Sequence, residues 1–225
     1  MKKVGFIGAF DKTDLMVYVA RILVELQKKV LIVDSTILGK ARYTVPSISP
    51  SKYYVTEFEG IDVAIGFNNL ENIADYLGVY ELQYDLVLID VDSHENFLKF
   101  NLENADKNYF VTGFDNYSLK KGLEAIGKMP TKIPMTKVLF SRDMLQEEED
   151  YLNFLSFYYS VQWEEGKICF PFDNGDSTVI IENQRAAKVG FRNLSLEYRE
   201  GLLELTNEIM PEIKEGEIKR VIKNI

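Results

Sequence analysis

The stretch VGFIGAFDKTDLMVYVARIL, residues Val4–Leu23, decides the fold. It begins as a short apolar run, turns at Gly8, continues through Lys12 and Thr13, and then shows helical periodicity. This order of strand, glycine turn, Lys-Thr pair and helix is typical of a phosphate-binding loop, in which backbone N–H groups at a helix start hold phosphate oxygens. Asp11 stands where such loops have a glycine. Three interpretations therefore stay open: a working phosphate site, the remnant of one, or a plain strand–turn–helix.

The composition is ordinary for a globular protein. The chain has 225 residues, of which 46% are apolar and 27% charged, and it is long enough to bury one substantial core. Its longest apolar runs are far shorter than the roughly 20 residues of a membrane span, and its first residues predict no signal peptide. The formal charge of −9 argues against a whole-surface attraction to nucleic acid. A single cysteine, Cys169, rules out an internal disulfide and favours the reducing cytoplasm.

Short apolar runs alternate with helical patterns along the chain. The runs that predict buried strands are Val4–Ala9, Val30–Asp34, Ile61–Phe67, Leu86–Val91, Tyr109–Gly113, Lys137–Ser141 and Ile168–Phe172. Helices are predicted from Leu15 to Leu26 and over Leu70–Leu77, Tyr117–Ile126 and Glu147–Tyr158. The segment Tyr43–Thr56, which contains two prolines, predicts a long loop. We therefore expect a single α/β domain, residues 1–215, with a mainly parallel twisted sheet of about seven strands and helices on both faces.

Two predicted strands end in an aspartate. Asp34 ends KKVLIVD and Asp90 ends YDLVLID. Because ligands of open parallel sheets bind at the carboxyl ends of the strands, both carboxylates are expected near Lys12 and Thr13. A lysine, a hydroxyl and strand-end carboxylates are groups that can bind phosphate together with Mg²⁺. Each feature alone is common without a ligand, since Asp or Thr before a helix is usually an N-cap. Their order along the chain favours a phosphate site.

The chain resembles the MinD/ParA family of deviant-Walker P-loop ATPases over nearly its whole length. The family loop K-G-G-x-G-K-T is matched by the segment from Ile7 to Thr13, which reads IGAFDKT. The runs KKVLIVD and YDLVLID resemble the family's second strand and its Walker B strand. CFPFDNGD resembles the late Pro-x-Asp segment near the adenine, and AAKVGFRNLSLEYREGLLELTNEI resembles the closing helices. The resemblance implies a P-loop NTPase fold that binds ATP or ADP with Mg²⁺.

The resemblance also implies a role for individual residues. The positions that it places around the nucleotide are Gly8, Asp11, Lys12, Thr13, Asp34, Asp90 and Asp173. Lys12 is expected to contact the phosphates, and Thr13 to bind the magnesium ion. Asp34 and Asp90 are expected in the outer shell of that ion, and Asp173 near the base.

Four departures from the family pattern weaken hydrolysis. The first loop lysine of the family, which reaches a partner's phosphates across a dimer, is Ile7, and the aspartate associated with the attacking water is Thr36. The proline after Walker B is Asp92. Asp11 replaces a glycine, and its carboxylate at about 5 Å from a phosphate would cost on the order of 3 kcal/mol. Since phosphoryl transfer depends on positioning and charge stabilisation, we expect binding to survive and efficient hydrolysis to be lost.

The function implied by the resemblance is that of a switch or scaffold. Atypical members similar to the pilus-assembly protein TadZ also have a degenerate Walker A loop. We therefore expect a cytoplasmic, homodimeric, nucleotide-binding protein that positions protein components of a pilus, secretion, division or partition machine. Two alternatives stay open: an active ATPase of the same family, and an interaction module that has lost nucleotide binding.

Other reactive or aromatic residues do not predict a catalytic site. His94 is the only histidine and is expected in a solvated loop, and one histidine with one cysteine argues against zinc. Ser35 and Ser93 have no base partner that would make a hydrolase. One cluster comprises Tyr151, Phe154, Phe157, Tyr158, Tyr159 and Trp163. It is either an interaction surface or a helix that buries one aromatic face, and we favour the buried helix.

The closing residues 216–225 predict a cationic amphipathic helix. Its apolar positions are Ile218, Val221, Ile222 and Ile225, with Lys219, Arg220 and Lys223 between them. This pattern is typical of a membrane-surface anchor, and members of the MinD branch end in such a helix. One interpretation of the tail is therefore a peripheral location at the inner face of the membrane. The alternative is a terminal helix that packs on its own domain.

Overall fold

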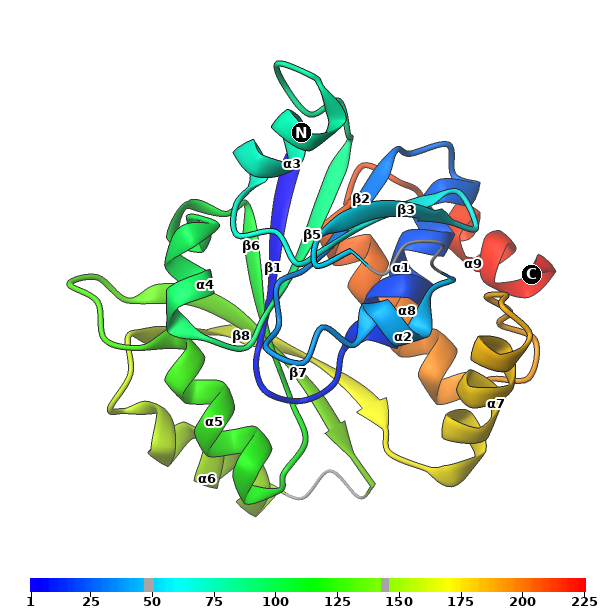
Figure 1. Ribbon diagram of the computed structural model, residues 1–225. Coiled ribbons are helices and arrows are strands. Elements are labelled where there is room, and N and C mark those ends of the chain that lie inside the picture. The colour runs from blue at the N-terminus through cyan, green and yellow to red at the C-terminus, as the bar shows by residue number, and fades with distance from the viewer. Residues whose placement is uncertain (47–50, 143–145) are drawn as a thin grey trace.

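Near-continuous apolar runs form a twisted sheet at the centre of the molecule (Figure 1). The computed structural model describes residues 1–46, 51–142 and 146–225. The strands are β1 (Lys2–Ile7), β2 (Val30–Asp34), β3 (Tyr54–Phe58), β4 (Ile61–Ile65), β5 (Leu86–Val91), β6 (Lys107–Thr112), β7 (Ile133–Ser141) and β8 (Val161–Pro171). They pair in the order β3-β4-β2-β5-β1-β6-β7-β8. All neighbours are parallel except β3 and β4, which are antiparallel.

Helices cover both faces of the sheet. They are α1 (Thr13–Glu25), α2 (Ala41–Thr44), α3 (Leu70–Leu77), α4 (His94–Lys99), α5 (Asn116–Ile126), α6 (Gln146–Ser156), α7 (Asn174–Arg185), α8 (Leu196–Ile209) and α9 (Glu215–Asn224). Along β5, Leu86 and Leu88 enter one core cluster, whereas Val87 and Ile89 enter the other. Residues of α1, α8 and α9 belong to the first cluster, against which partly buried residues of α7 pack, and residues of α3, α4, α5 and α6 belong to the second. The predicted α/β architecture with helices on both faces is confirmed (Figure 1).

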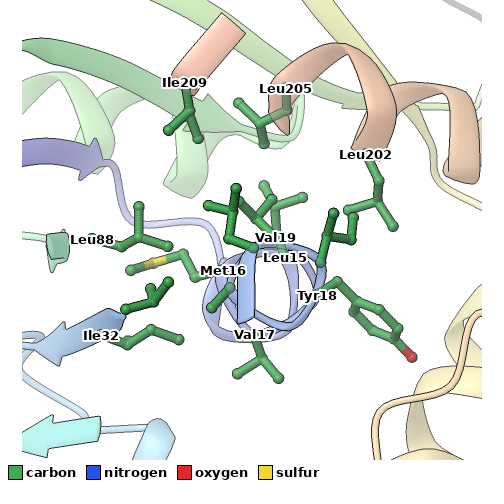
Figure 2. Close-up of a cluster of buried hydrophobic side chains, with 14 of the residues drawn as sticks. Leu15, Met16, Val17, Tyr18, Val19, Ile32, Leu88, Leu202, Leu205 and Ile209 are labelled. Atoms are coloured by element: carbon green, nitrogen blue, oxygen red, sulfur yellow. The ribbon is translucent and has the colours of Figure 1, made fainter. Parts of the chain in front are cut away.

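Helix α1 is enclosed by the sheet and by α8. Figure 2 shows its side chains between Ile32 and Leu88 of the sheet and Leu202, Leu205 and Ile209 of α8. Apolar residues lie on almost every side of this helix, which is why its sequence shows a broad apolar face instead of a narrow stripe. The loop before α1 is therefore attached to the most deeply packed helix of the domain.

The long loop predicted over Tyr43–Thr56 is wrong at both ends. Helix α2 ends at Thr44, and β3 begins at Tyr54; residues 47–50 of this segment lie outside the described part. Strand β3 pairs with β4 through a two-residue turn, in which Glu59 and Gly60 have φ of 55° and 80°. Positive φ at both central residues is the geometry of a tight hairpin. This hairpin raises the number of strands from the expected seven to eight.

Polar elements account for the other differences. Strands β7 and β8 begin earlier than predicted. Pro134 and Thr136 interrupt the apolar pattern of β7, which also has an irregularity between Met135 and Lys137, and charged side chains interrupt that of β8. Helices α4 and α7 were not predicted, since they depend on N-caps by Ser93 and Asp173 more than on apolar periodicity. His94 is thus the first residue of a helix and not a loop residue.

Helix α9 buries the apolar face that was expected to contact a membrane. Ile218, Val221 and Ile222 are 0%, 9% and 6% exposed, and they join the core cluster of α1 and α8. In this structure the face is inside the domain, as the alternative interpretation of the tail predicts. A membrane contact through these residues would require α9 to detach. Among the described residues, none of the helices combines the length and apolar character of a transmembrane segment.

Truncating the buried face of α9 should destabilise the domain. We expect Ile218→Ala to lower the free energy of unfolding by about 2–5 kcal/mol, because it leaves a cavity in the core. Urea denaturation measures the change. The matched control is Lys223→Ala on the exposed face of the same helix, with an expected change within about 0.5 kcal/mol. Equal unfolding curves for both variants would show that α9 does not pack on the domain in solution.

Candidate functional site

The loop between β1 and α1 lies at the carboxyl edge of the sheet. Gly8 follows β1 with φ of 141°, and its N–H donates to the carbonyl of Val91 at 3.1 Å. A Cβ at this position would lie 2.3 Å from the carbonyl oxygen of Val111 on β6. Only glycine fits there, because both the backbone conformation and the close approach exclude a side chain. The glycine turn that the sequence predicts is confirmed as a close contact between two strands.

The ammonium of Lys12 lies inside this loop. Lys12 is 2% exposed, and its Nζ donates to the carbonyl oxygens of Gly8 at 2.6 Å and Phe10 at 3.5 Å. The same Nζ forms an ion pair at 2.6 Å with Oδ1 of Asp90, the aspartate near the end of β5. A lysine in this position closes the loop on itself and brings a positive charge to the start of α1.

Asp90 is a buried carboxylate at the centre of the edge. Its pKa is raised to about 7, mainly by burial; the Lys12 ammonium opposes this shift, and repulsion by Asp34 and Asp11 contributes to it. Asp34 is its register partner on the neighbouring strand β2. The structure therefore brings the two strand-end carboxylates together, as the sequence predicted.

Asp34 is already engaged by the loop that follows β2. Its Oδ1 accepts the N–H and the hydroxyl of Thr36 at 2.9 and 2.6 Å, and its Oδ2 accepts the N–H of Ala41 at 2.8 Å. Asp92 accepts the N–H of Ile37 at 3.0 Å. Both carboxylates thus fix the loop between β2 and α2. A metal ion near Asp34 would have to act through its waters, or take the place of these hydrogen bonds.

Asp11 points toward Lys40 and toward the start of α1. Its Oδ2 lies 2.8 Å from Nζ of Lys40, and its Oδ1 accepts the backbone N–H of Thr13 at 3.2 Å. A carboxylate of the chain therefore occupies one N–H group that a phosphate would use at the helix start. Lys40 also reduces the repulsion expected from Asp11. Sequence reasoning missed this lysine, because 29 positions separate the two residues.

Thr13 and Asp173 have different surroundings. Thr13 is the first residue of α1 and is 4% exposed, next to Lys12. Asp173 accepts the N–H groups of Gly175 and Asp176 at 2.6 and 3.0 Å, so its carboxylate serves as the N-cap of α7. Within the described residues, no group of three or more histidine, cysteine, aspartate or glutamate side chains could hold a metal ion by itself.

A cleft of about 290 Å³ opens beside the loop, between α1 and α7. On its apolar side the ring of Phe10 stacks on Phe140 with centroids 4.7 Å apart and meets Phe172 at 6.2 Å. Its polar side includes Asp14, which accepts the side-chain amide of Gln184 at 2.8 Å. Rings beside the phosphate loop could stack on a flat base. Phe10 occupies the variable position of the family loop, and its part in this cleft was not predicted.

Carboxylates outnumber ammonium groups at this edge. The acidic groups are Asp11, Asp14, Asp34, Asp90 and Asp92, and the basic groups are Lys12 and Lys40. An anion that binds here must overcome this charge, and it must also compete with Asp90 for Lys12. The residues fit a phosphate that arrives with a divalent cation better than a free phosphate. Thr13 and Asp90, with Asp34 behind them, are the groups that could hold that cation, which would neutralise phosphate charge.

Solved structures of other proteins have a similar fold. The structure is similar to a ParA family ATPase from Chlorobium tepidum TLS, with a TM-score of 0.58, 14% identity and coverage of 100% of this chain and 97% of that chain. It is similar to a putative plasmid partition protein from Borrelia burgdorferi B31 bound to AMPPNP, with a TM-score of 0.59, 12% identity and coverage of 94% and 98%. The chain has the fold of the ParA and MinD ATPases.

A third similar structure is a cell division protein complex. The MinC:MinD complex of Aquifex aeolicus matches with a TM-score of 0.58 and 12% identity, over 95% of this chain and 97% of that chain. No protein-family model and no curated protein matches the sequence. At these identities the likeness concerns the fold, and the site must be argued from the residues described above.

The stability of the protein should depend on pH through Asp14. Burial raises the pKa of its carboxyl to about 6, from an ordinary value of 3.8. The folded state therefore binds this proton more tightly than the unfolded state, so the carboxyl costs nothing below pH 3.8 and destabilises the fold increasingly between pH 3.8 and 6. About two pKa units correspond to about 3 kcal/mol above pH 6.

Asp14→Asn should remove this cost and keep an oxygen that accepts from Gln184. We expect the stability of the variant relative to the original chain to rise by up to about 3 kcal/mol between pH 4 and pH 7.5. Urea unfolding at both pH values measures it, with Asp75→Asn on the exposed side of α3 as the control. A constant difference across this range would contradict a raised pKa.

Proposed function

We propose that the protein is a ParA/MinD-like, nucleotide-binding switch or scaffold that positions a larger cellular machine, with weak or absent ATP hydrolysis. The observation that carries the proposal is that the charged and polar groups of the loop between β1 and α1 already have partners within the chain. Lys12 is in place to meet a phosphate, but Asp90 neutralises it and Asp11 caps the start of α1. Such a loop can bind a nucleotide with Mg²⁺ if phosphate oxygens replace Asp90 at Lys12 and Asp11 at the start of α1. Without a nucleotide, the same groups remain paired within the chain.

The loss of hydrolysis is supported by two positions. Ile7, where the family has a lysine that reaches the partner's phosphates, is fully buried in β1 and carries no charge. Thr36, where the family has an aspartate near the attacking water, is bound to Asp34. Neither position supplies a group that stabilises the charge of a transition state.

A homodimer that meets through the carboxyl edge is part of this proposal. Exposed apolar residues surround the site: Ile37 and Leu38 follow β2, Tyr117 follows β6, and Phe172 follows β8. Their exposed fractions lie between 57% and 71%. Apolar side chains gathered around a polar centre are typical of an interface.

We propose the kind of assembly from the proteins whose solved structures are similar. Two similar structures are a putative plasmid partition protein and a cell division complex. We extend this to a partition, division, pilus or secretion assembly in the cytoplasm. Interaction with the membrane face would depend on release of α9. Nucleic acid is a less favoured partner because of the charge of −9.

An interaction module that has lost nucleotide binding is the second candidate. The observation that favours it is again the self-satisfied loop, whose charges pair with one another. An active ATPase is the third, and it would need another group to position water. Nucleotide binding and turnover separate these candidates.

ATP with Mg²⁺ should raise the melting temperature of the protein. A ligand at 100 times its dissociation constant stabilises by about 2.7 kcal/mol. We expect the Lys12→Met/Asp90→Asn variant to lose this protection, and removing both charges avoids leaving one buried alone. ATP without Mg²⁺ should protect less, because acidic groups dominate the edge. Differential scanning fluorimetry measures all three conditions.

The matched control is the exposed ion pair of α4. Lys99→Met/Glu95→Gln removes an ammonium and a carboxylate that lie 2.6 Å apart and are 41% and 73% exposed, and it should keep the full protection. Asp11→Gly should increase the affinity by a factor of about five or less, since Lys40 already offsets the charge. The same melting curve with and without nucleotide at millimolar ATP would leave only the interaction module.

Turnover should be close to background at saturating ATP. Ordinary enzymes turn over at about one per second or faster, and we expect phosphate release far below this rate. Thr36→Asp, which restores the family residue, should not by itself give full activity, because Ile7 still lacks a charge. A rate of about one per second in the original chain would refute the scaffold with impaired hydrolysis and favour the active ATPase.

A further inference from the structure

An aromatic stripe covers the outer side of α6. We give this name to Tyr151, Phe154, Phe157 and Tyr158, whose exposed fractions are 41%, 57%, 81% and 66%. Their spacing of three and four positions places them along one side of the helix and of the turn that follows it. The interpretation favoured from the sequence, a helix that buries its aromatic face, is wrong for these four residues.

The opposite side of α6 is firmly attached to the domain. Leu152 is fully buried in the second core cluster, and Ser156 accepts the indole N–H of Trp163 at 3.0 Å. Glu149 pairs with Lys137 at 2.6 Å and also with Lys167. Because these contacts fix the rotation of the helix, the aromatic stripe cannot turn inward without breaking them.

Exposed aromatic side chains gathered in this way are typical of a binding surface. Each such ring buries a large apolar area when it is covered, and rings are enriched among the residues that dominate binding energy. Single exposed apolar residues are normal, but contiguous patches mark interaction sites. The aromatic stripe shares no residue with the set proposed for the homodimer.

The negative charge around the aromatic stripe favours a partner with a positive charge. Helix α6 reads QEEEDYLNFLS, with four acidic residues and no basic one. Glu147 and Asp150 are exposed and form no ion pair with any residue that the structure describes. We propose that the aromatic stripe binds an amphipathic helix of a protein partner, with its apolar face on the rings and lysines or arginines beside Glu147 and Asp150.

Three other occupants fit this surface less well. A second copy packed α6 against α6 would bring like charges together, which is unfavourable. The cationic helix of the chain itself, α9, has its apolar face in the core. An anionic membrane would be repelled by the same acidic residues. A basic amphipathic helix can cover the aromatic rings with its apolar face and pair its positive charges with the acidic residues of α6.

Trp163 makes the proposal measurable in the intact protein. It is the only tryptophan of the chain, and its indole contacts α6 through Ser156. The probe is a synthetic peptide of about 15 residues, long enough to form a helix on binding, with leucine on one face and lysine on the other. We expect saturable binding, followed by the fluorescence of Trp163.

Variants and control peptides separate the two parts of the surface. Phe154→Ser/Phe157→Ser should weaken binding by at least about tenfold with an unchanged melting temperature. The matched control is Tyr80→Ser, which removes a fully exposed aromatic outside α6 and should bind normally. A peptide with serine in place of leucine, or with glutamate in place of lysine, should bind far more weakly.

Four results would overturn the proposal. Equal binding of the serine peptide would show general attraction to an acidic protein, and equal binding of the glutamate peptide would remove the charge argument. Self-association that the Phe154→Ser/Phe157→Ser variant abolishes would assign the stripe to a second copy. Loss of vesicle binding in that variant would assign it to a membrane. The Lys12→Met/Asp90→Asn variant should bind the peptide normally, so a failure of the nucleotide proposal is distinguishable from a failure here.

Discussion

The ion pair between Lys12 and Asp90 is the interaction on which the candidate site depends. Both side chains are almost completely buried, at 2% and 4% exposed. Removing two charges from water is costly, and the cost is offset only when each charge finds good partners. Lys12 has Gly8 and Asp90, and Asp90 has Lys12 as its counter-charge. This pair joins the ends of β1 and β5 to the first turn of α1, so the loop has a defined shape without a ligand.

The ion pair between Lys12 and Asp90 is coupled electrostatically to the other charged residues of the site. Asp34 raises the pKa of Asp90 through charge repulsion, while its own oxygens hold the loop after β2. Asp11 adds a further negative charge and is tied to Lys40. A ligand that approaches Lys12 therefore changes the balance of several charges at once. That coupling is the physical basis of the proposal that the loop responds to a nucleotide.

Much of the fold could be predicted because the central strands are nearly continuous apolar runs. Strand β5 and helix α1 have patterns that only burial on two sides explains. The carboxyl ends of parallel strands meet at one edge, so Asp34 and Asp90 could be placed together from the sequence. The hairpin at Glu59 could not, since its turn relies on a residue that rarely adopts positive φ. The link from Asp11 to Lys40 depends on the folded loop, and the orientation of α6 depends on partners from β7 and β8.

The outer strand β8 affects how copies of this chain can associate. It is 11 residues long and lies at an open edge of the sheet, where unpaired backbone groups invite another strand. Its sequence places Glu164, Glu165 and Lys167 in the middle and Pro171 at the end. Charges and proline on an edge oppose uncontrolled sheet extension. Copies of this chain can therefore be brought to high local concentration with less risk of aggregating into a continuous sheet, which leaves association to side-chain surfaces.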